Sequence, residues 1–123
     1  MPRFVVLAHD WPEPHLDLFL EAGDALRAWK LPADFSLDNP ATILPNAPHR
    51  RLYLDFEGEL TGDRGSVLCW DRGEFQWMEE SPELFRANFA GQRLSGVYEW
   101  ITAASSTWIF QKAANKDLAS GTA

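Results

Sequence analysis

The sequence predicts a mainly β protein: a small antiparallel β-barrel with one or two short helical turns. Stretches in which apolar and polar residues alternate recur along the chain, and a period of two is typical of strands with one buried face. Pro, Gly, Asn and Asp separate these stretches, and about seven to nine short strands at such spacing are typical of a barrel or a sandwich. With 123 residues, 46% of them hydrophobic, the chain is long enough for one domain whose core needs no disulfide.

The first elements are predicted to be a strand and then a hairpin. Residues 3–8 (RFVVLA) form the first strand. Residues 15–21 alternate strictly, so that Leu16, Leu18 and Leu20 make the core face. The opposite face of this strand is expected to be solvated or to line a cleft.

Turn residues then divide the middle of the chain. Gly23 marks the turn into the second strand of the hairpin, 25–31. Residues 32–48, rich in Pro, Asn and Asp, are predicted to form a loop with at most one short strand. Residues 51–57 alternate again and are predicted to be a strand.

The second half of the chain continues the same pattern. Gly73 and Gly91 are expected in turns, and Ser81 is expected to cap one turn of helix with Pro82 at its first position. The predicted strands of this half are 66–71, 74–78, 85–90, 93–102 and 107–112.

Composition and charge limit the classes of function. The chain has 18 acidic and 11 basic side chains, a formal charge of −7, so contact with nucleic acid has to be local rather than through a basic surface. Cys69 is the single cysteine, which favours a reducing cytoplasm. No apolar run approaches about 20 residues and no leader is apparent, so we expect a cytoplasmic monomer without a membrane segment. Residues 1–112 are expected to form the barrel domain, and 113–123 a flexible or frayed tail.

The residues best suited to binding a metal or to catalysis lie near the N-terminus. His15 and Asp17 are two apart on one predicted strand, so an imidazole and a carboxylate project from the same face. His9 follows the preceding strand, and the stiff connection 11–14 (WPEP) can bring it back beside His15. Two imidazoles and a carboxylate suit Mn²⁺, Zn²⁺ or Fe²⁺ with positions left open for water or substrate. On this pattern alone, a metal site and a solvated polar face are equally open.

These residues belong to a longer pattern: RFVVLAHDWPEPHLDLFLEAGDALRAWKLP, then HRRLYLDFEG, WDRG, LSGVYEW and WIFQK. Over about residues 3–112 the pattern resembles the 3′-phosphoesterase domain of bacterial DNA ligase D. The resemblance implies a small β-barrel that uses a divalent metal, Mn²⁺ first and Zn²⁺ or Co²⁺ next, to remove a 3′-phosphate or a 3′-terminal ribonucleotide in DNA end repair. It implies a 3′ end of DNA or RNA as the partner, with a repair polymerase or ligase expected to act in trans.

The resemblance also assigns roles to individual residues. It implies that His9, His15 and Asp17 are the metal ligands and that His49 and Tyr53 are the catalytic, phosphate-contacting pair. His49 is expected to protonate the leaving oxygen or to bond the phosphate. Tyr53 is expected to donate a hydrogen bond to the same phosphate.

The chain departs from the family pattern at several places. Phe19 stands where the pattern His-x-Asp-x-Arg has its arginine, and Ala33 stands where a lysine usually follows Trp-x-x-Pro. The glycine-rich segment after Phe-Glu-Gly is shorter and lacks its tyrosine. A guanidinium gives a phosphate bidentate, charge-assisted bonds and a phenyl ring gives none. Either another cation replaces the arginine, or the substrate differs and Phe19 stacks on a base or sugar, or the site is inactive. The candidate cations are Arg27, Lys30, Arg50 and Arg51.

Two other functions stay open. His15, Asp17 and His49 resemble the two-histidine, one-carboxylate triad of non-haem Fe(II) oxygenases, although that interpretation leaves His9 unused. The second is a non-catalytic module that binds a 3′ end or a repair partner. Phe19 and the negative charge favour this module, whereas the complete set of ligands disfavours it.

The remaining chemically versatile residues are expected to be structural. Asp10 steadies a turn, Cys69 packs within a strand, and Asp55 and Glu57 are solvated. Residues 70–73 are expected to end a strand in a turn. The tryptophans expected in the core are Trp29, Trp70, Trp100 and Trp108.

Overall fold

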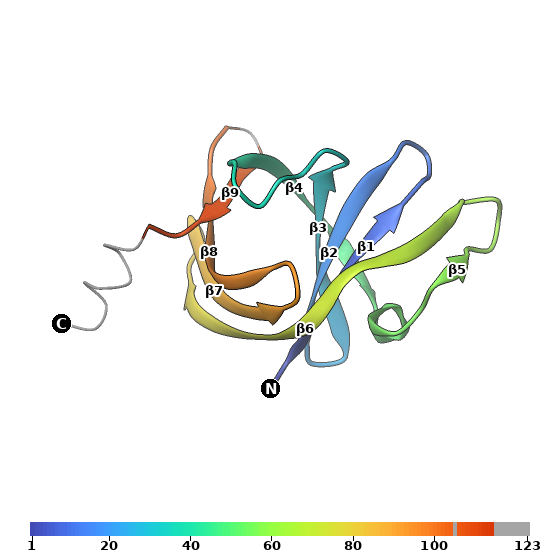
Figure 1. Ribbon diagram of the computed structural model, residues 1–123, viewed down its shortest axis with the longest axis horizontal. Helices are drawn as coiled ribbons and strands as arrows, with labels where there is room; N and C mark the ends of the chain where they lie inside the picture. Colours follow the sequence, from blue (N-terminus) through green and yellow to red (C-terminus); the bar gives the residue numbers. More distant parts are fainter. Residues whose placement is uncertain (105, 115–123) are drawn as a thin grey trace.

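A computed structural model describes residues 1–104 and 106–114 of the chain (Figure 1). Nearly all regular structure in these residues is strand. The elements are β1 (Arg3–His9), β2 (His15–Ala22), β3 (Ala25–Pro32), β4 (Ala41–Arg50), the 3₁₀ helix η1 (Arg51–Leu54), β5 (Gly58–Glu59), β6 (Ser66–Glu80), β7 (Leu84–Gly91), β8 (Ser95–Thr102) and β9 (Trp108–Lys112).

Eight of the strands close into a barrel. The sheet order is β1-β2-β3-β4-β9-β8-β7-β6, and β6 pairs back onto β1. Every pair is antiparallel, and closure removes the unpaired edges that an open sheet would expose. The short β5 pairs with β6 outside this ring (Figure 1). The predicted antiparallel β-barrel is therefore confirmed.

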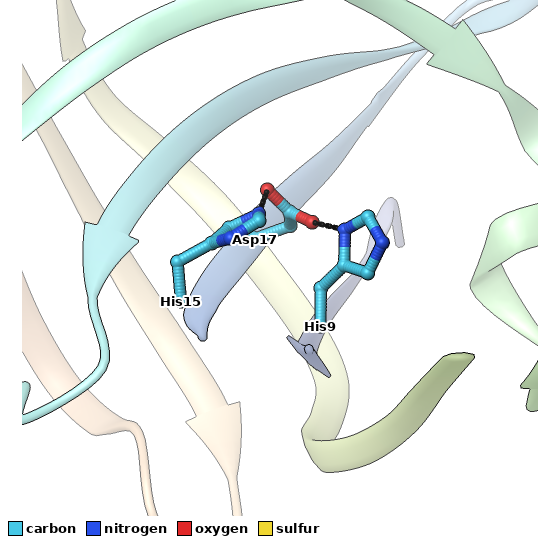
Figure 2. Close-up of side chains that lie close together, drawn as sticks. All are labelled: His9, His15 and Asp17. Carbon is cyan, nitrogen blue, oxygen red and sulfur yellow. Dashed lines mark ion pairs between the residues drawn. The ribbon is translucent and has the colours of Figure 1, made fainter. Parts of the chain in front are cut away.

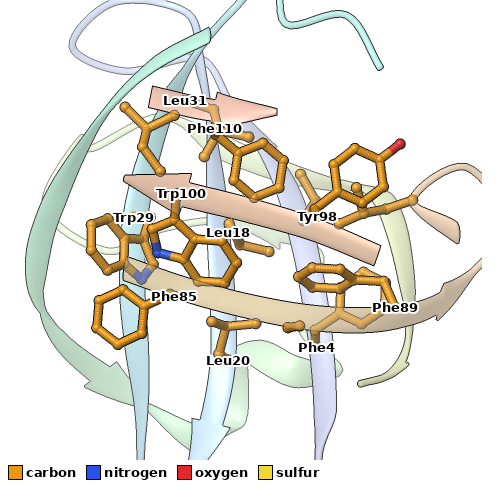
Figure 3. Packing of buried hydrophobic residues seen from close by; sticks show 14 of the residues in the cluster. Phe4, Leu18, Leu20, Trp29, Leu31, Phe85, Phe89, Tyr98, Trp100 and Phe110 are labelled. Atoms are coloured by element: carbon orange, nitrogen blue, oxygen red, sulfur yellow. The ribbon is translucent and has the colours of Figure 1, made fainter. Parts of the chain in front are cut away.

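Inward-facing side chains, many of them aromatic, fill the barrel (Figure 3). Leu18 and Leu20 of β2 are fully buried there, as predicted. Trp29 of β3 meets Trp100 of β8 edge to face with ring centroids 6.0 Å apart, and Phe85 stacks on Trp100 at 5.5 Å. Such pairs add roughly 0.5–1.5 kcal/mol each beyond the area they bury. The predicted core tryptophans are buried at Trp29, Trp100 and Trp108 and half-buried at Trp70.

A second apolar cluster lies outside the barrel and corrects one prediction. The first predicted alternative, a solvated face opposite the leucines of β2, is wrong at Phe19, which is only 2% exposed because the segment after β4 folds back over this wall and buries Leu54 against it. The second alternative, a cleft, holds at His15, which lines a cavity. Cys69 packs against the same cluster, as predicted, and its backbone N–H donates to the exposed Glu57. The buried members of this outer cluster are Val5, Leu7, Phe19, Leu26, Ala28, Leu54 and Val67.

The segment that covers the wall is not the strand predicted over 51–57. Strand β4 is ten residues long, longer than the short strand allowed in the predicted loop, and it pairs with β3 and β9. Because β3 and β9 already occupy the two edges of β4, residues 51–54 have no free strand edge beside β4 to pair with, and they form η1 instead. Within η1, Leu54 is the buried residue, and Tyr53 and Phe56 pack half-buried beside it.

Strand β6 is one strand of 15 residues where the sequence predicts two. Gly73 lies inside it, and a Cβ at this position would collide with the carbonyl oxygen of Ala90, so glycine permits the close approach of β7. Asp71 also lies within the strand rather than at its end. Its buried carboxylate accepts the backbone N–H groups of residues 92–94, which secures the turn between β7 and β8.

One smaller prediction is corrected in the turn between β6 and β7. Ser81 caps no helix; its hydroxyl oxygen accepts the backbone N–H of Leu84. Ala113, the first residue of the predicted tail, is buried and donates its N–H to the carbonyl of Val97. Residues 115–123 of that tail lie outside the described residues.

Candidate metal centre

The β1–β2 hairpin brings three polar side chains to the outer wall of the barrel. His9 and His15 are directly opposite each other in the antiparallel register, and Leu7 is opposite Asp17. Because alternate residues of a strand share a face, His9, His15 and Asp17 project to the same side. The connection 10–14 returns the chain as predicted, and the two imidazole rings lie with their centroids 4.9 Å apart.

The Asp17 carboxylate lies between the two imidazoles (Figure 2). Its Oδ2 is 3.4 Å from His9 Nδ1, and its Oδ1 is 3.2 Å from His15 Nε2. One donor atom from each of the three residues lies within 4.8 Å of the others. His15 and Asp17 are buried and His9 is half-buried. This group is called the triad of His9, His15 and Asp17.

Backbone carbonyls determine which nitrogen of each imidazole is free. His9 Nε2 is 2.9 Å from the carbonyl oxygen of Arg64, and His15 Nδ1 is 2.8 Å from that of Glu13. A carbonyl oxygen can only accept, so each of these nitrogens carries a hydrogen and donates it. In the neutral rings, the lone pairs of His9 Nδ1 and His15 Nε2 are therefore on the side of the Asp17 carboxylate.

This arrangement fits a divalent transition metal. Three electron-pair donors on one side repel one another unless a cation or a proton lies among them, and a hydrogen bond from the far nitrogen to a carbonyl is the usual support of a metal-binding imidazole. Imidazole and carboxylate together suit Mn²⁺, Fe²⁺, Co²⁺ and Zn²⁺. The residues predicted as ligands are thus brought together in a form able to hold such an ion.

The turn before β6 supports the site. Asp10 accepts the backbone N–H and the hydroxyl of Ser66 at 2.7 and 3.1 Å, and the Ser66 N–H lowers the pKa of Asp10. Gly65 has a φ of 78°, and a Cβ there would collide with the Asp10 carboxylate, so the turn requires glycine. The predicted role of Asp10 in steadying a turn is confirmed.

The predicted catalytic pair, His49 and Tyr53, lies around Phe19. The His49 and Tyr53 rings have their centroids 4.8 and 6.0 Å from that of Phe19. His49 Nδ1 donates to the carbonyl of Ala47 at 2.7 Å, which leaves Nε2 for other partners. Because Phe19 follows Asp17 by two residues on β2, the pair lies farther along the same outer wall, beside the triad rather than within it.

Ion pairs hold η1 and the residues after it against this wall. The Arg51 guanidinium pairs with Glu21 of β2, and Arg3 pairs with the exposed Asp55 at 3.1 Å. Glu21 also accepts the backbone N–H of Arg3 at 2.9 Å. That N–H, together with Arg51, holds the pKa of Glu21 below its usual 4.5, and the Arg3 side chain lowers the pKa of Asp55.

These lowered pKa values predict a loss of stability in acid. A carboxylate whose pKa is lower in the folded state stabilises the fold above its unfolded pKa, and this contribution disappears as the pH falls through the folded pKa. The free energy of unfolding should therefore fall as the pH drops below about 4.5. Glu21→Gln should be less stable at neutral pH and should lose less stability in acid. Urea unfolding at pH 7, 5, 4 and 3 gives the free energy of unfolding against pH for the wild type and for Glu21→Gln. If the two curves were parallel, the stabilising role assigned to the Glu21 carboxylate would be wrong.

A cavity of about 300 Å³ lies beside the triad at the rim of the barrel. It is formed where β1 ends and β2 and β6 begin, and Leu68, 63% exposed, forms part of its wall. A neighbouring cavity of about 480 Å³ shares Asp10 and Ser66 with it and is lined by further carboxylates. The residues lining the first cavity are Ala8, His9, Asp10, Pro14, His15, Leu16, Ala33, Ser66 and Leu68.

Fold and site together define a class of protein: a small antiparallel β-barrel whose outer wall carries two histidines and a carboxylate able to hold a metal. A family model, described as the DNA Ligase D 3′-phosphoesterase domain, matches residues 7–102, a range that includes the triad, His49 and Tyr53. The chain belongs to this phosphoesterase family, which confirms the resemblance found in the sequence. No curated protein matches the chain. Within the described part of the chain, no helix is long and apolar enough to span a bilayer.

Proposed function

We propose that the chain is a divalent-metal-dependent phosphoesterase that removes a 3′-phosphate or a 3′-terminal ribonucleotide from ends of DNA or RNA. His9, His15 and Asp17 hold the ion, for which Mn²⁺ is the first candidate, ahead of Zn²⁺ and Co²⁺. The observation that carries the proposal is the pair of imidazole lone pairs beside Asp17, each fixed by a backbone carbonyl. Membership of the family supports the class of reaction.

When bound, a divalent ion polarises a phosphoryl oxygen and lowers the pKa of water. The part of the protein is to hold the ester and to supply a proton to the departing oxygen. In this proposal His49 supplies that proton through Nε2, the nitrogen not used by Ala47, and the Tyr53 hydroxyl donates to a phosphoryl oxygen. The ion pair between Arg51 and Glu21 keeps the element that carries Tyr53 in place.

The cavity at the barrel rim is the proposed seat of the terminal nucleoside. Its wall combines apolar groups, Ala8, Pro14 and Leu68 among them, with the imidazoles of His9 and His15. Apolar surface suits the faces of a base and sugar. A nucleoside bound there would have its 3′-phosphate beside the two imidazoles that hold the ion. A contact confined to the 3′ end of the nucleic acid also agrees with the formal charge of −7, because an acidic protein does not attract a long phosphate backbone.

The two alternative functions differ in their support. The Fe(II) triad of His15, Asp17 and His49 lacks a geometric basis, because His9 completes the cluster and His49 rests on Phe19. The non-catalytic module has one observation in its favour: Phe19, 2% exposed, occupies the position where the family has its phosphate-binding arginine. Turnover separates this module from the enzyme.

A primer–template with a 3′-phosphate tests the proposal. Incubation with Mn²⁺ should yield a 3′-hydroxyl that a polymerase can extend, with release of inorganic phosphate, and a chelator should stop the reaction. A matched duplex ending in one 3′-ribonucleotide tests the second substrate. If neither substrate turned over while Mn²⁺-dependent binding of the end persisted, the chain would be the binding module and the enzyme proposal would be wrong.

A further inference from the structure

The chain lacks the family arginine at position 19, and two of the four candidate cations are committed elsewhere. Arg27 pairs with Glu80 at 3.4 Å, and its guanidinium lies 4.6 Å from the centre of an aromatic ring. Arg51 pairs with Glu21 and donates to a backbone carbonyl in the turn between β2 and β3. Neither guanidinium is available to a phosphate beside the triad.

The other two candidates lie at different levels of the barrel wall. Arg50 is opposite Ala25 at the start of β3, whereas Lys30 is opposite Asp17. From Ala25 to Lys30 the strand advances by five residues, which is about 16 Å at about 3.3 Å per residue. Lys30 is therefore the candidate cation at the level of the triad.

Lys30 also lies on the same face as the triad. On β3, Leu26 and Ala28 belong to the outer cluster and Trp29 to the barrel interior, so the alternation of the strand places Lys30 outside. Directly opposite residues on one face of a sheet have their Cβ atoms about 4.5–5.5 Å apart. Lys30 is half-buried, and within the described ranges it forms no ion pair with a carboxylate. Asp17 is paired with the two imidazoles instead.

We infer that Lys30 binds the terminal phosphate and supplies the positive charge that the chain lacks at position 19. This inference rests on the proposed function and names a substrate-binding residue for it. An ammonium group is a compact charge with three donors, so it can contact phosphoryl oxygens although it lacks the planar fork of arginine. Because Lys30 is directly opposite Asp17 in the sheet, its ammonium group would contact the same phosphate that lies beside the triad. The chain should therefore prefer a phosphorylated 3′ end to a 3′-hydroxyl end.

Binding of single-stranded DNA that ends in a non-hydrolysable 3′-methylenephosphonate tests the inference without turnover. The wild type, with Mn²⁺, should bind this end more tightly than the same strand with a 3′-hydroxyl. Lys30→Gln should weaken binding of the phosphonate end on the order of tenfold to a hundredfold and should remove most of the preference. It should also reduce the slope of log K against log[salt] by about 0.7, the contribution of one neutralised phosphate on a single strand.

Two controls separate this role from a structural one. Lys112→Gln removes the same charge from an exposed position on β9 and should bind both ends as the wild type does. Lys30→Arg should keep the preference, and Lys30→Gln should keep the rise in Tm produced by Mn²⁺ alone, since the triad is intact. If Lys30→Gln retained the wild-type preference and slope while the wild type hydrolysed the phosphate, the inference would be wrong and the proposed function would stand. If the wild type showed no preference for the phosphorylated end and hydrolysed neither that end nor the 3′-ribonucleotide end, both would be wrong.

Discussion

His15→Ala is expected to abolish hydrolysis of a 3′-phosphorylated end and to remove the rise in Tm that Mn²⁺ gives the wild type. His15 contributes one of three donors, its free Nε2 lies 3.2 Å from Asp17, and its other nitrogen is held by Glu13. Loss of a group that merely orients a ligand costs about 10–100-fold in metal affinity or activity, so loss of the ligand itself should cost at least about 100-fold. A phosphate-release assay and thermal unfolding with and without Mn²⁺ measure the two effects.

The matched control for this prediction is His49→Ala. His49 lies beside Phe19 and outside the triad, so its removal should reduce turnover while the rise in Tm with Mn²⁺ persists. A rise in Tm that survived in His15→Ala would show that the ion binds elsewhere, and the metal centre assigned to His9, His15 and Asp17 would be wrong.

Phe19→Arg is expected to raise turnover on a 3′-phosphorylated end and to lower stability. A guanidinium at this position lies next to His49 and Tyr53, and one charged donor to the transition state is worth on the order of 10²–10³ in rate. The same change buries a charge in an apolar cluster where Phe19 is 2% exposed. We expect the free energy of unfolding to fall by about 3 kcal/mol or more. Rates normalised to the folded fraction, and urea unfolding, measure the two effects.

Phe19→Leu is the control, because it keeps an apolar side chain and adds no donor. It should lose stability without gaining rate. The gain from Phe19→Arg should be larger in a Lys30→Gln background than in the wild type, because the two cations would serve the same phosphate. If Phe19→Arg were no faster than Phe19→Leu, position 19 would not face the phosphate, and the family arginine could not be carried over to this chain.

The barrel could be predicted because its signal is local. Strict alternation at Leu16, Leu18 and Leu20 identifies a buried face from neighbouring residues alone, and glycine and proline mark most strand ends. The same logic fails for Phe19, since its burial depends on η1, which is more than thirty residues away in the chain. It fails again at Gly73, where the close approach of β7, and not a turn, requires the glycine.

In the site, too, the features set by neighbouring residues could be predicted and those set by distant parts of the chain could not. His15 and Asp17 could be paired because they are two residues apart on a strand, and the return of His9 follows from the short connection between strands. The groups that fix the imidazoles are the carbonyl oxygens of Glu13 and Arg64. A backbone oxygen is present at every residue, so residue type gives no signal of its use. Gly65, next to Arg64, is a residue whose type does reflect the constrained turn, because its φ is 78°.

On β2 the proposed ligands alternate with residues of the barrel interior, so the polar residues lie on one face of the strand and the apolar residues on the other. A shift of one residue in the pairing of this strand would turn Leu16 and Leu18 outward and carry His15 and Asp17 inside. An ion held between β1 and β2 and the packing of the interior therefore favour the same alignment of the two strands. Metal loading should in consequence slow the exchange of the β1–β2 amide hydrogens more than those of β7 and β8.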